Sequence, residues 1–319
     1  MLSSNYRRKL AYGCIVTAAS ALIMLFGCAT TPRGAFTAAS AVTQLVGLLP
    51  PDAYLYGSIN VERERALADE LVQRTGFSGD MPKSALSRTK LLVFAAEQPP
   101  SANPPAAEPT RFSLVASGNY PAGLLAFRLD TNSSWKVVGH HPTQWQNSAS
   151  GLELAVPSRE LILLSNGGIS GLVARYTSPS PSGLDGWKSA DGSAMSVYVP
   201  EAAPLLARLG PEAERVPVTR MYFEATPAAD SSDYTITANL TMLSERDARL
   251  FSVVFRLLIA GTVTTGNVLP LSLAGAQLAV NGSTITLTKV RMGRAQLVGL
   301  LSSLLPRRSD ATPGQGSRK

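Results

Sequence analysis

The sequence predicts an α+β fold in which antiparallel β-sheets carry helices packed on one face. Short segments of alternating apolar residues are interspersed with longer segments that have the apolar periodicity of helices. The order strand, helix, two strands, helix, hairpin, helix can be read twice along the chain, which indicates a tandem duplication. In addition, Asn281-Gly282 between two alternating segments is a strong hairpin signal.

The first half of the expected body, residues 37–183, begins with a strand over Ala53–Val61 and a charged helix over Glu62–Gln73. Acidic and basic side chains mix along that helix, which is typical of a solvated face. Another helix starts near Pro121, because proline is tolerated in a first turn. The remaining elements expected here are strands over Lys90–Ala96, Arg111–Gly118, Trp135–Val138, Leu152–Val156 and Leu161–Ser165 and a helix over Ile169–Tyr176.

The second half, residues 184–306, repeats this order. A helix over Glu201–Leu209 ends at Gly210, a usual residue after a helix. Ser244 followed by Asp247 is a variant capping box that opens a helix. The other expected elements are strands over Ala194–Val199, Val216–Ala225, Tyr234–Met242, Gln277–Val280 and Thr284–Val290 and a final helix over Ala295–Leu305.

A short sequence echo supports the duplication. Ala126-Phe127-Arg128-Leu129 recurs as Val254-Phe255-Arg256-Leu257. Chance similarity between two apolar helices is the alternative explanation.

The first 27 residues have the layout of a bacterial export signal. Arg7, Arg8 and Lys9 form a basic segment, and an uncharged, mostly apolar run over Cys14–Phe26 follows it. That run is shorter than the roughly 20 residues that a membrane-spanning helix needs, and it has the length of a signal-peptide core. An uncleaved anchor with an incidental cysteine is the alternative.

The run ends in Leu25-Phe26-Gly27-Cys28, which resembles the lipobox of bacterial lipoproteins. Phe26 departs from the usual small residue, and this looseness is similar to the relaxed lipoboxes of spirochaetes. The resemblance implies that residues 1–27 are removed, that Cys28 is acylated and that residues 28–36 form a tether. In enteric lipoproteins, an aspartate directly after the acylated cysteine retains the protein in the inner membrane. Ala29 occupies that position here, so by analogy we expect the protein to be anchored in the outer membrane, with its body in the periplasm.

Cysteine and charge content exclude several classes of function. Cys14 and Cys28 are the two cysteines, so processing leaves no free thiol for a disulfide, redox chemistry or a metal. Removal of the signal segment takes away three basic residues and lowers the formal net charge from +7 to +4. A charge of +4 is smaller than is typical of nucleic-acid-binding proteins. The basic tail over 307–319 has almost nothing to bury and is expected to be disordered.

No set of residues in the sequence predicts catalysis, a metal site or a cofactor. His140 and His141 are adjacent, so on a strand they point to opposite faces and cannot easily form a pair. Phosphate-binding, nucleophile-elbow, zinc and calcium motifs are absent from the sequence. We therefore expect a protein that is not an enzyme.

Three segments instead carry broad apolar helical faces with little opposing charge. They are Ala38–Leu49, Arg246–Ala260 and Ala295–Leu305, and the first and third share the hexapeptide Gln-Leu-Val-Gly-Leu-Leu. Such faces suit helices that lie in a membrane interface, or helices packed into the protein's own core. The residues expected to contact a membrane or lipid-like ligand are Leu45, Leu48, Leu49, Leu250, Phe251, Val254, Phe255, Leu258, Leu297, Leu300, Leu301 and Leu304.

These observations predict a lipid-anchored envelope protein that engages a bilayer or a lipid-like ligand through its amphipathic helices. In general character it resembles the spirochaetal outer-membrane lipoproteins of mixed α/β fold that bear membrane-inserting helices. The alternative is a scaffold subunit whose apolar faces dock a protein partner in an envelope assembly.

Overall fold

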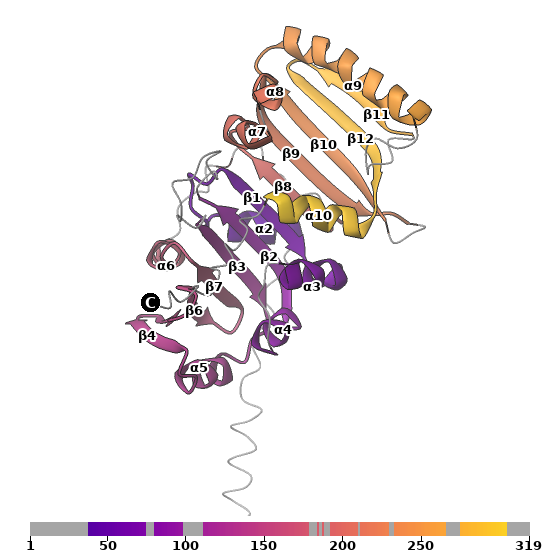
Figure 1. Ribbon diagram of the computed structural model, residues 1–319. Coiled ribbons are helices and arrows are strands. Elements are labelled where there is room, and N and C mark those ends of the chain that lie inside the picture. Colours follow the sequence, from indigo (N-terminus) through magenta and orange to yellow (C-terminus); the bar gives the residue numbers. More distant parts are fainter. Residues whose placement is uncertain are drawn as a thin grey trace, which may run out of the picture. The chain divides into compact units, whose positions relative to one another are not determined.

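A twelve-stranded antiparallel sheet forms the centre of the body (Figure 1). The computed structural model describes residues 38–74, 80–97, 111–178, 184, 187, 192–209, 211–229, 233–265 and 275–304, and these belong to one compact unit. The strands are β1 (Leu55–Asn60), β2 (Thr89–Ala96), β3 (Phe112–Gly118), β4 (Trp135–His140), β5 (Thr143–Asn147), β6 (Glu153–Ser158), β7 (Leu161–Ser165), β8 (Met195–Val199), β9 (Val218–Pro227), β10 (Tyr234–Met242), β11 (Gln277–Asn281) and β12 (Thr284–Met292).

The helices connect these strands or precede the sheet. They are α2 (Ala38–Val46), α3 (Arg65–Arg74), α4 (Asp80–Leu86), α5 (Ala122–Asp130), α6 (Ser170–Thr177), α7 (Ala203–Leu209), α8 (Pro211–Glu214), α9 (Glu245–Thr265) and α10 (Arg294–Leu304). The predicted α+β class with antiparallel pairing is confirmed. Strand β5 and helices α4 and α8 are additions that the sequence patterns did not predict.

The sheet order repeats outward from its centre. Strands β1 and β8 pair at the middle, and the order runs β1-β2-β3-β7-β6 on one side and β8-β9-β10-β12-β11 on the other. Helices follow the first and third strands of each half, so α3 corresponds to α7 and α5 to α9. The hairpin β4–β5 extends the first half alone. The two halves therefore share one order of elements, and they build one continuous sheet instead of two.

Most helices cover one face of the sheet. Core residues from α3, α4, α7, α9 and α10 form one apolar cluster with alternate residues of the central strands, and α5 packs over the same face toward the β4 end. Helices α2 and α6 pack with Trp187 on the opposite face. The expectation of helices on a single face thus holds for most of them, and α2 and α6 are the exceptions.

Buried polar contacts join the two halves at the central seam. Ser58 of β1 and Ser196 of β8 face each other in register, with their hydroxyl oxygens 2.7 Å apart. The indole Nε1 of Trp187 donates to the Ser196 hydroxyl at 2.9 Å. Since a buried hydroxyl without a partner is costly, this chain of hydrogen bonds helps to fix the register of the seam.

Helix α2 is attached to the body through its C-terminal end. The Arg175 Nε on α6 donates to the carbonyl of Leu48 at 2.8 Å, and the Tyr56 hydroxyl donates to the carbonyl of Pro50 at 2.6 Å. Leu48 and Leu49 lie in the turn after the helix and are buried. The segment that follows the expected tether is therefore part of the core.

The hairpin predicted at Asn281-Gly282 is present, with a different turn geometry. Asn281 pairs with Thr284, so the two loop residues are Gly282 and Ser283. Gly282 has φ +56°, and Asn281 is not in the positive-φ region. An Asn-Gly pair favours a type I′ turn with positive φ at both residues, so the expectation of such a turn centred on Asn281-Gly282 is wrong. A glycine with positive φ at the first loop position is the requirement of a type II′ turn.

Substitution of this glycine is expected to destabilise the protein. A Cβ at Gly282 would meet nothing within 4 Å, so the cost of Gly282→Val is conformational, because a β-branched residue fits positive φ poorly. We expect a loss of about 1 kcal/mol or more in the free energy of unfolding, measured by denaturant titration. Ser283→Ala in the same turn is the control and should change little. Equal stability of the Gly282→Val variant would contradict the assigned turn.

Candidate functional site

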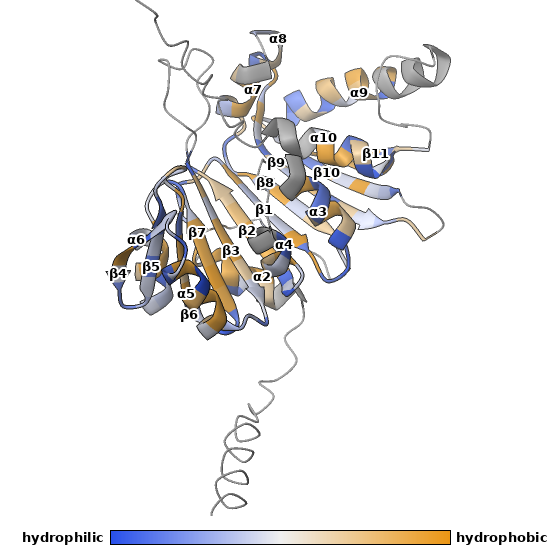
Figure 2. Cartoon of the chain, turned by 60° about the horizontal axis from the view of Figure 1, so that its bottom comes forward, coloured by the Kyte–Doolittle hydropathy of each residue, from blue (hydrophilic) through white to orange (hydrophobic). Residues whose placement is uncertain are grey.

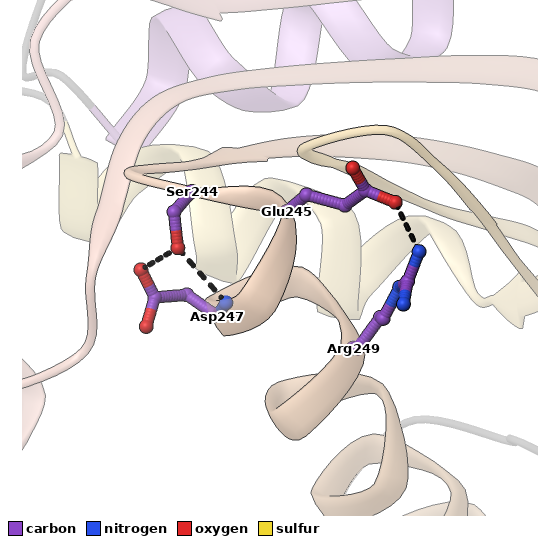
Figure 3. A network of polar contacts seen from close by, with 4 residues as sticks. All are labelled: Ser244, Glu245, Asp247 and Arg249. Atoms are coloured by element: carbon purple, nitrogen blue, oxygen red, sulfur yellow. Dashed lines mark hydrogen bonds and ion pairs between the residues drawn. The ribbon is translucent and has the colours of Figure 1, made fainter.

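Helix α9 begins at a well-formed N-cap (Figure 3). The Ser244 hydroxyl accepts from the Asp247 backbone N–H at 3.1 Å and donates to the Asp247 carboxylate at 2.6 Å. Glu245 and Arg249, one turn apart, form an exposed ion pair. The variant capping box predicted from the sequence is therefore confirmed, and it sets the start of the helix.

A narrow side of α9 faces the β10–β12–β11 end of the sheet (Figure 1). Ala248 is fully buried and Ser252 is 5% exposed, while Phe251 and Phe255 are half-buried against the core. The Ser252 hydroxyl donates to the Arg249 carbonyl within the helix at 2.7 Å. Small and half-buried residues thus let the helix lie close to the sheet.

The opposite side of α9 is apolar and faces away from the sheet. Leu250, Val253, Val254 and Leu257 are 57%, 54%, 49% and 67% exposed. Their spacing of three, four and seven residues places them in one stripe along the helix. We call these four residues the outer stripe. Figure 2 shows apolar and charged positions side by side along α9, and Arg249 and Arg256 are exposed beside the stripe.

The outer stripe contains two predicted contact residues, Leu250 and Val254, and two that were not predicted, Val253 and Leu257. The sequence places Arg249, Ser252 and Arg256 on one narrow polar side, which would normally face water. The structure buries Ser252 and exposes four large aliphatic residues. Monomeric soluble proteins rarely expose contiguous apolar patches that serve no function. The outer stripe is therefore the strongest candidate for a functional surface among the described residues.

The predicted contact residues divide into four groups. Leu250 and Val254 are exposed in the outer stripe, while Phe251, Phe255 and Leu45 are half-buried. Leu48, Leu49 and Leu297 are buried in the core, so in this conformation they cannot contact a bilayer. This part of the expectation is corrected: α10 and the α2 segment use these leucines for packing. The side chains of Leu258, Leu300, Leu301 and Leu304, as well as Cys28 and the tail over 307–319, lie outside the described residues.

Helix α5 exposes two further apolar residues, which were not among the predicted contact residues. Leu124 and Phe127 are 49% and 64% exposed, while Leu129 is fully buried. The helix has nine residues, of which Leu129 alone is buried, so its apolar pattern is too short to define its faces. The sequence signal that could have identified this pair is its three-residue spacing. That spacing places Leu124 and Phe127 on the side of the helix opposite the buried Leu129.

The described residues contain no metal cluster of three or more His, Cys, Asp or Glu side chains. His140 ends β4 and His141 lies in the turn before β5, and both are exposed. The helices among the described residues are all too short or too polar to cross a bilayer.

A hollow of about 550 Å³ lies at the start of α10, and its lining is charged. Asp233, Arg291, Arg294 and Gln296 contribute to it. Next to it the Tyr234 hydroxyl donates to the Glu64 carboxylate at 2.6 Å, and burial together with this hydrogen bond raises the pKa of Tyr234 to about 12. Charged side chains share the lining of this hollow with Met292 and Ala295, whereas the outer stripe of α9 consists of aliphatic residues alone.

The described residues define an α+β protein with one antiparallel sheet and an exposed aliphatic stripe on helix α9. Residues 40–291 match the family described as "Outer membrane-associated lipoprotein TP0453", and the chain belongs to this family. It is therefore an outer membrane-associated lipoprotein of the cell envelope.

Solved structures of TP0453 share this fold. Crystal form I is 15% identical, with a TM-score of 0.57, over 81% of this chain and 96% of that one. Crystal form III is 16% identical, with a TM-score of 0.55, over 81% and 97%. Crystal form IV is 16% identical, with a TM-score of 0.57, over 83% and 99%. No curated protein matched the chain.

Proposed function

We propose that this protein is a non-enzymatic lipoprotein, anchored by a lipid on Cys28, whose helix α9 lies in the interface of a bilayer. The exposed outer stripe of α9 carries this proposal, because four aliphatic side chains stand in water on the side of the helix away from the core. The family is associated with the outer membrane, and the surface of a bilayer would cover such a stripe. The Cys28 anchor is supported by the lipobox resemblance.

The energetics favour a shallow insertion. Burial of a methylene in the bilayer contributes about 0.8 kcal/mol, so partial insertion of several aliphatic side chains exceeds thermal energy. Arg249 and Arg256 flank the stripe, where their long side chains can reach the lipid headgroups while the aliphatic residues enter the acyl region. The two contacts differ in permanence: the covalent lipid holds the protein at the membrane, and α9 sets how the body lies on it.

Flotation of the unacylated protein tests this proposal. The chain from residue 28 onward with Cys28→Ser is mixed with vesicles of phosphatidylglycerol and phosphatidylcholine and centrifuged through a density gradient. We expect a substantial fraction to float with the vesicles and to stay bound in high salt, because the binding is mainly apolar. A protein that remains wholly in the aqueous fraction would overturn the proposal and favour docking of an envelope protein partner.

A further inference from the structure

Strand β11 forms one edge of the sheet, and no described strand lies on its outer side (Figure 1). The two-residue loop of the β11–β12 hairpin makes Asn281 and Thr284 a hydrogen-bonded pair, and such pairs alternate along an antiparallel register. The backbone N–H and C=O groups of Leu278 and Val280 therefore point away from β12. Strand β11 thus presents two donors and two acceptors for which the described residues supply no partner.

The first half of the sheet shows what this position in the fold accepts. Strand β6 holds in the first half the place that β11 holds in the second. The outer side of β6 is paired with β5, antiparallel, with Gln144 opposite Ala155 and Gln146 opposite Glu153. The position therefore accepts an antiparallel strand, which the chain itself supplies in the first half and no described segment supplies in the second.

The two edges of the sheet differ in how they are protected. Strand β4, at the other edge, carries the exposed Lys136, and its register shifts between Val137 and Gly139. A charge and an irregular register on an edge strand both oppose pairing with another strand. Strand β11 has the uncharged sequence Gln-Leu-Ala-Val-Asn, and its register with β12 is continuous. Strand β11 is therefore the edge that can take a further strand.

The open groups of β11 are complementary to those of a second copy of the same strand. With two copies antiparallel about a two-fold axis at Ala279, Leu278 of each copy lies opposite Val280 of the other. Each such pair exchanges two N–H···O=C bonds, so all the outward groups are satisfied. The exposed Ala279 meets its own counterpart in a non-hydrogen-bonded pair, where Cα atoms approach to about 4.5 Å and a small side chain fits. Gln277 lies opposite Asn281 of the other copy, so two uncharged amides meet.

We propose that two copies of this protein associate through β11 as a symmetric dimer, with the axis at Ala279 and one antiparallel sheet continuous across it. The occupant is a second copy, because the same groups serve both partners at this register and no like charges are brought together. Pairing of identical edges closes on itself and ends at a dimer. The dimer is separate from the proposed membrane contact of α9, since it uses backbone groups at the sheet edge and needs no lipid.

Sedimentation equilibrium of the unacylated mature chain without lipid tests the association. The interface is small, so we expect a reversible dimer with a dissociation constant on the order of 0.1 mM. Ala279→Lys and Ala279→Glu each place like charges opposite each other at the axis, and each should weaken dimerisation about tenfold or more. An equimolar mixture of the two variants should restore it, because lysine then meets glutamate. Circular dichroism should show both variants folded like the wild type, because Ala279 is exposed.

Cross-linking through single cysteines tests the register. The chain from residue 28 onward with Cys28→Ser contains no cysteine, so one can be introduced at a chosen position. Ala279→Cys should form a disulfide-linked dimer on mild oxidation, because the Cα separation expected at the axis lies within the range of disulfides. Gln277→Cys is the matched control on the same exposed side of β11. It should stay monomeric, because its counterpart would lie roughly 13 Å or more away.

Three results would overturn the proposal. A chain that stays monomeric at about 1 mM forms no such dimer, and its open edge would be left for an extended segment of another protein. A dimer that both Ala279→Lys and Ala279→Glu leave intact uses another surface. Equal disulfide formation at positions 277 and 279 indicates random collision or a different register. None of these results bears on the vesicle flotation described above, so the dimer and the membrane contact of α9 can fail separately.

Discussion

Replacement of Leu297 by aspartate is expected to unfold the protein. Leu297 is 2% exposed and Val298 beside it is fully buried, and both belong to the larger core cluster. A carboxylate at this position would lose the leucine contacts and enter the core without a partner. We expect a cost of about 4 kcal/mol or more, a large part of the stability of an ordinary domain.

Circular dichroism against temperature measures this effect. Ala295→Asp is the matched control, because Ala295 is exposed in the first turn of the same helix, where an acidic residue is tolerated or favourable. The control should melt close to the wild type. If Leu297→Asp melted at the same temperature as the control, Leu297 would lie outside the core, and α10 would again be a candidate for membrane contact.

Substitution of Cys28 by serine is expected to abolish acylation completely. The thiol is the group that receives the lipid in the resembled lipobox, and a serine hydroxyl does not replace it. Mass spectrometry of the mature N-terminus should find acylated Cys28 in the wild type and no acylated species in Cys28→Ser. Cys14→Ser is the control, because Cys14 lies inside the apolar run and should be removed with it. An intact Met1 on the envelope-associated protein would contradict the proposed anchor.

The parts of the fold that the sequence predicted correctly are those with local signals. The capping box at Ser244 and the hairpin near Gly282 depend on short-range geometry, and both are present. Strand β5 was missed because Trp145 is its one buried residue, with polar neighbours, so it shows little apolar alternation.

The orientation of helices could not be predicted from periodicity. The helical pattern of α9 separates its sides, but it does not say which side meets the sheet. Ser252 faces the sheet because a small side chain permits close approach, and larger aliphatic residues then face outward. Nothing in the local sequence distinguishes this arrangement from the reverse one.

The repeated hexapeptide shows the same effect of context. Residues 44–49 and 296–301 are identical in sequence, yet α2 ends at Val46 and α10 continues through the repeat. Pro50 and Pro51 follow the first copy, and proline cannot extend a helix. The identical sequences therefore predicted two similar amphipathic helices. In the structure the first copy lies at the end of α2 and the second lies inside α10.

The central claim is that the outer stripe of α9 binds lipid and is not part of the core. Its most direct test is vesicle flotation of the unacylated chain carrying Val254→Asp and Leu257→Asp, with its melting temperature measured on the same sample. Both residues are about half exposed or more, so we expect a folded protein that melts near the wild-type temperature and floats far less. Ala174→Asp on α6 is the control and should float like the wild type. A folded double variant that floats as well as the wild type would contradict the claim, and so would a double variant that unfolds.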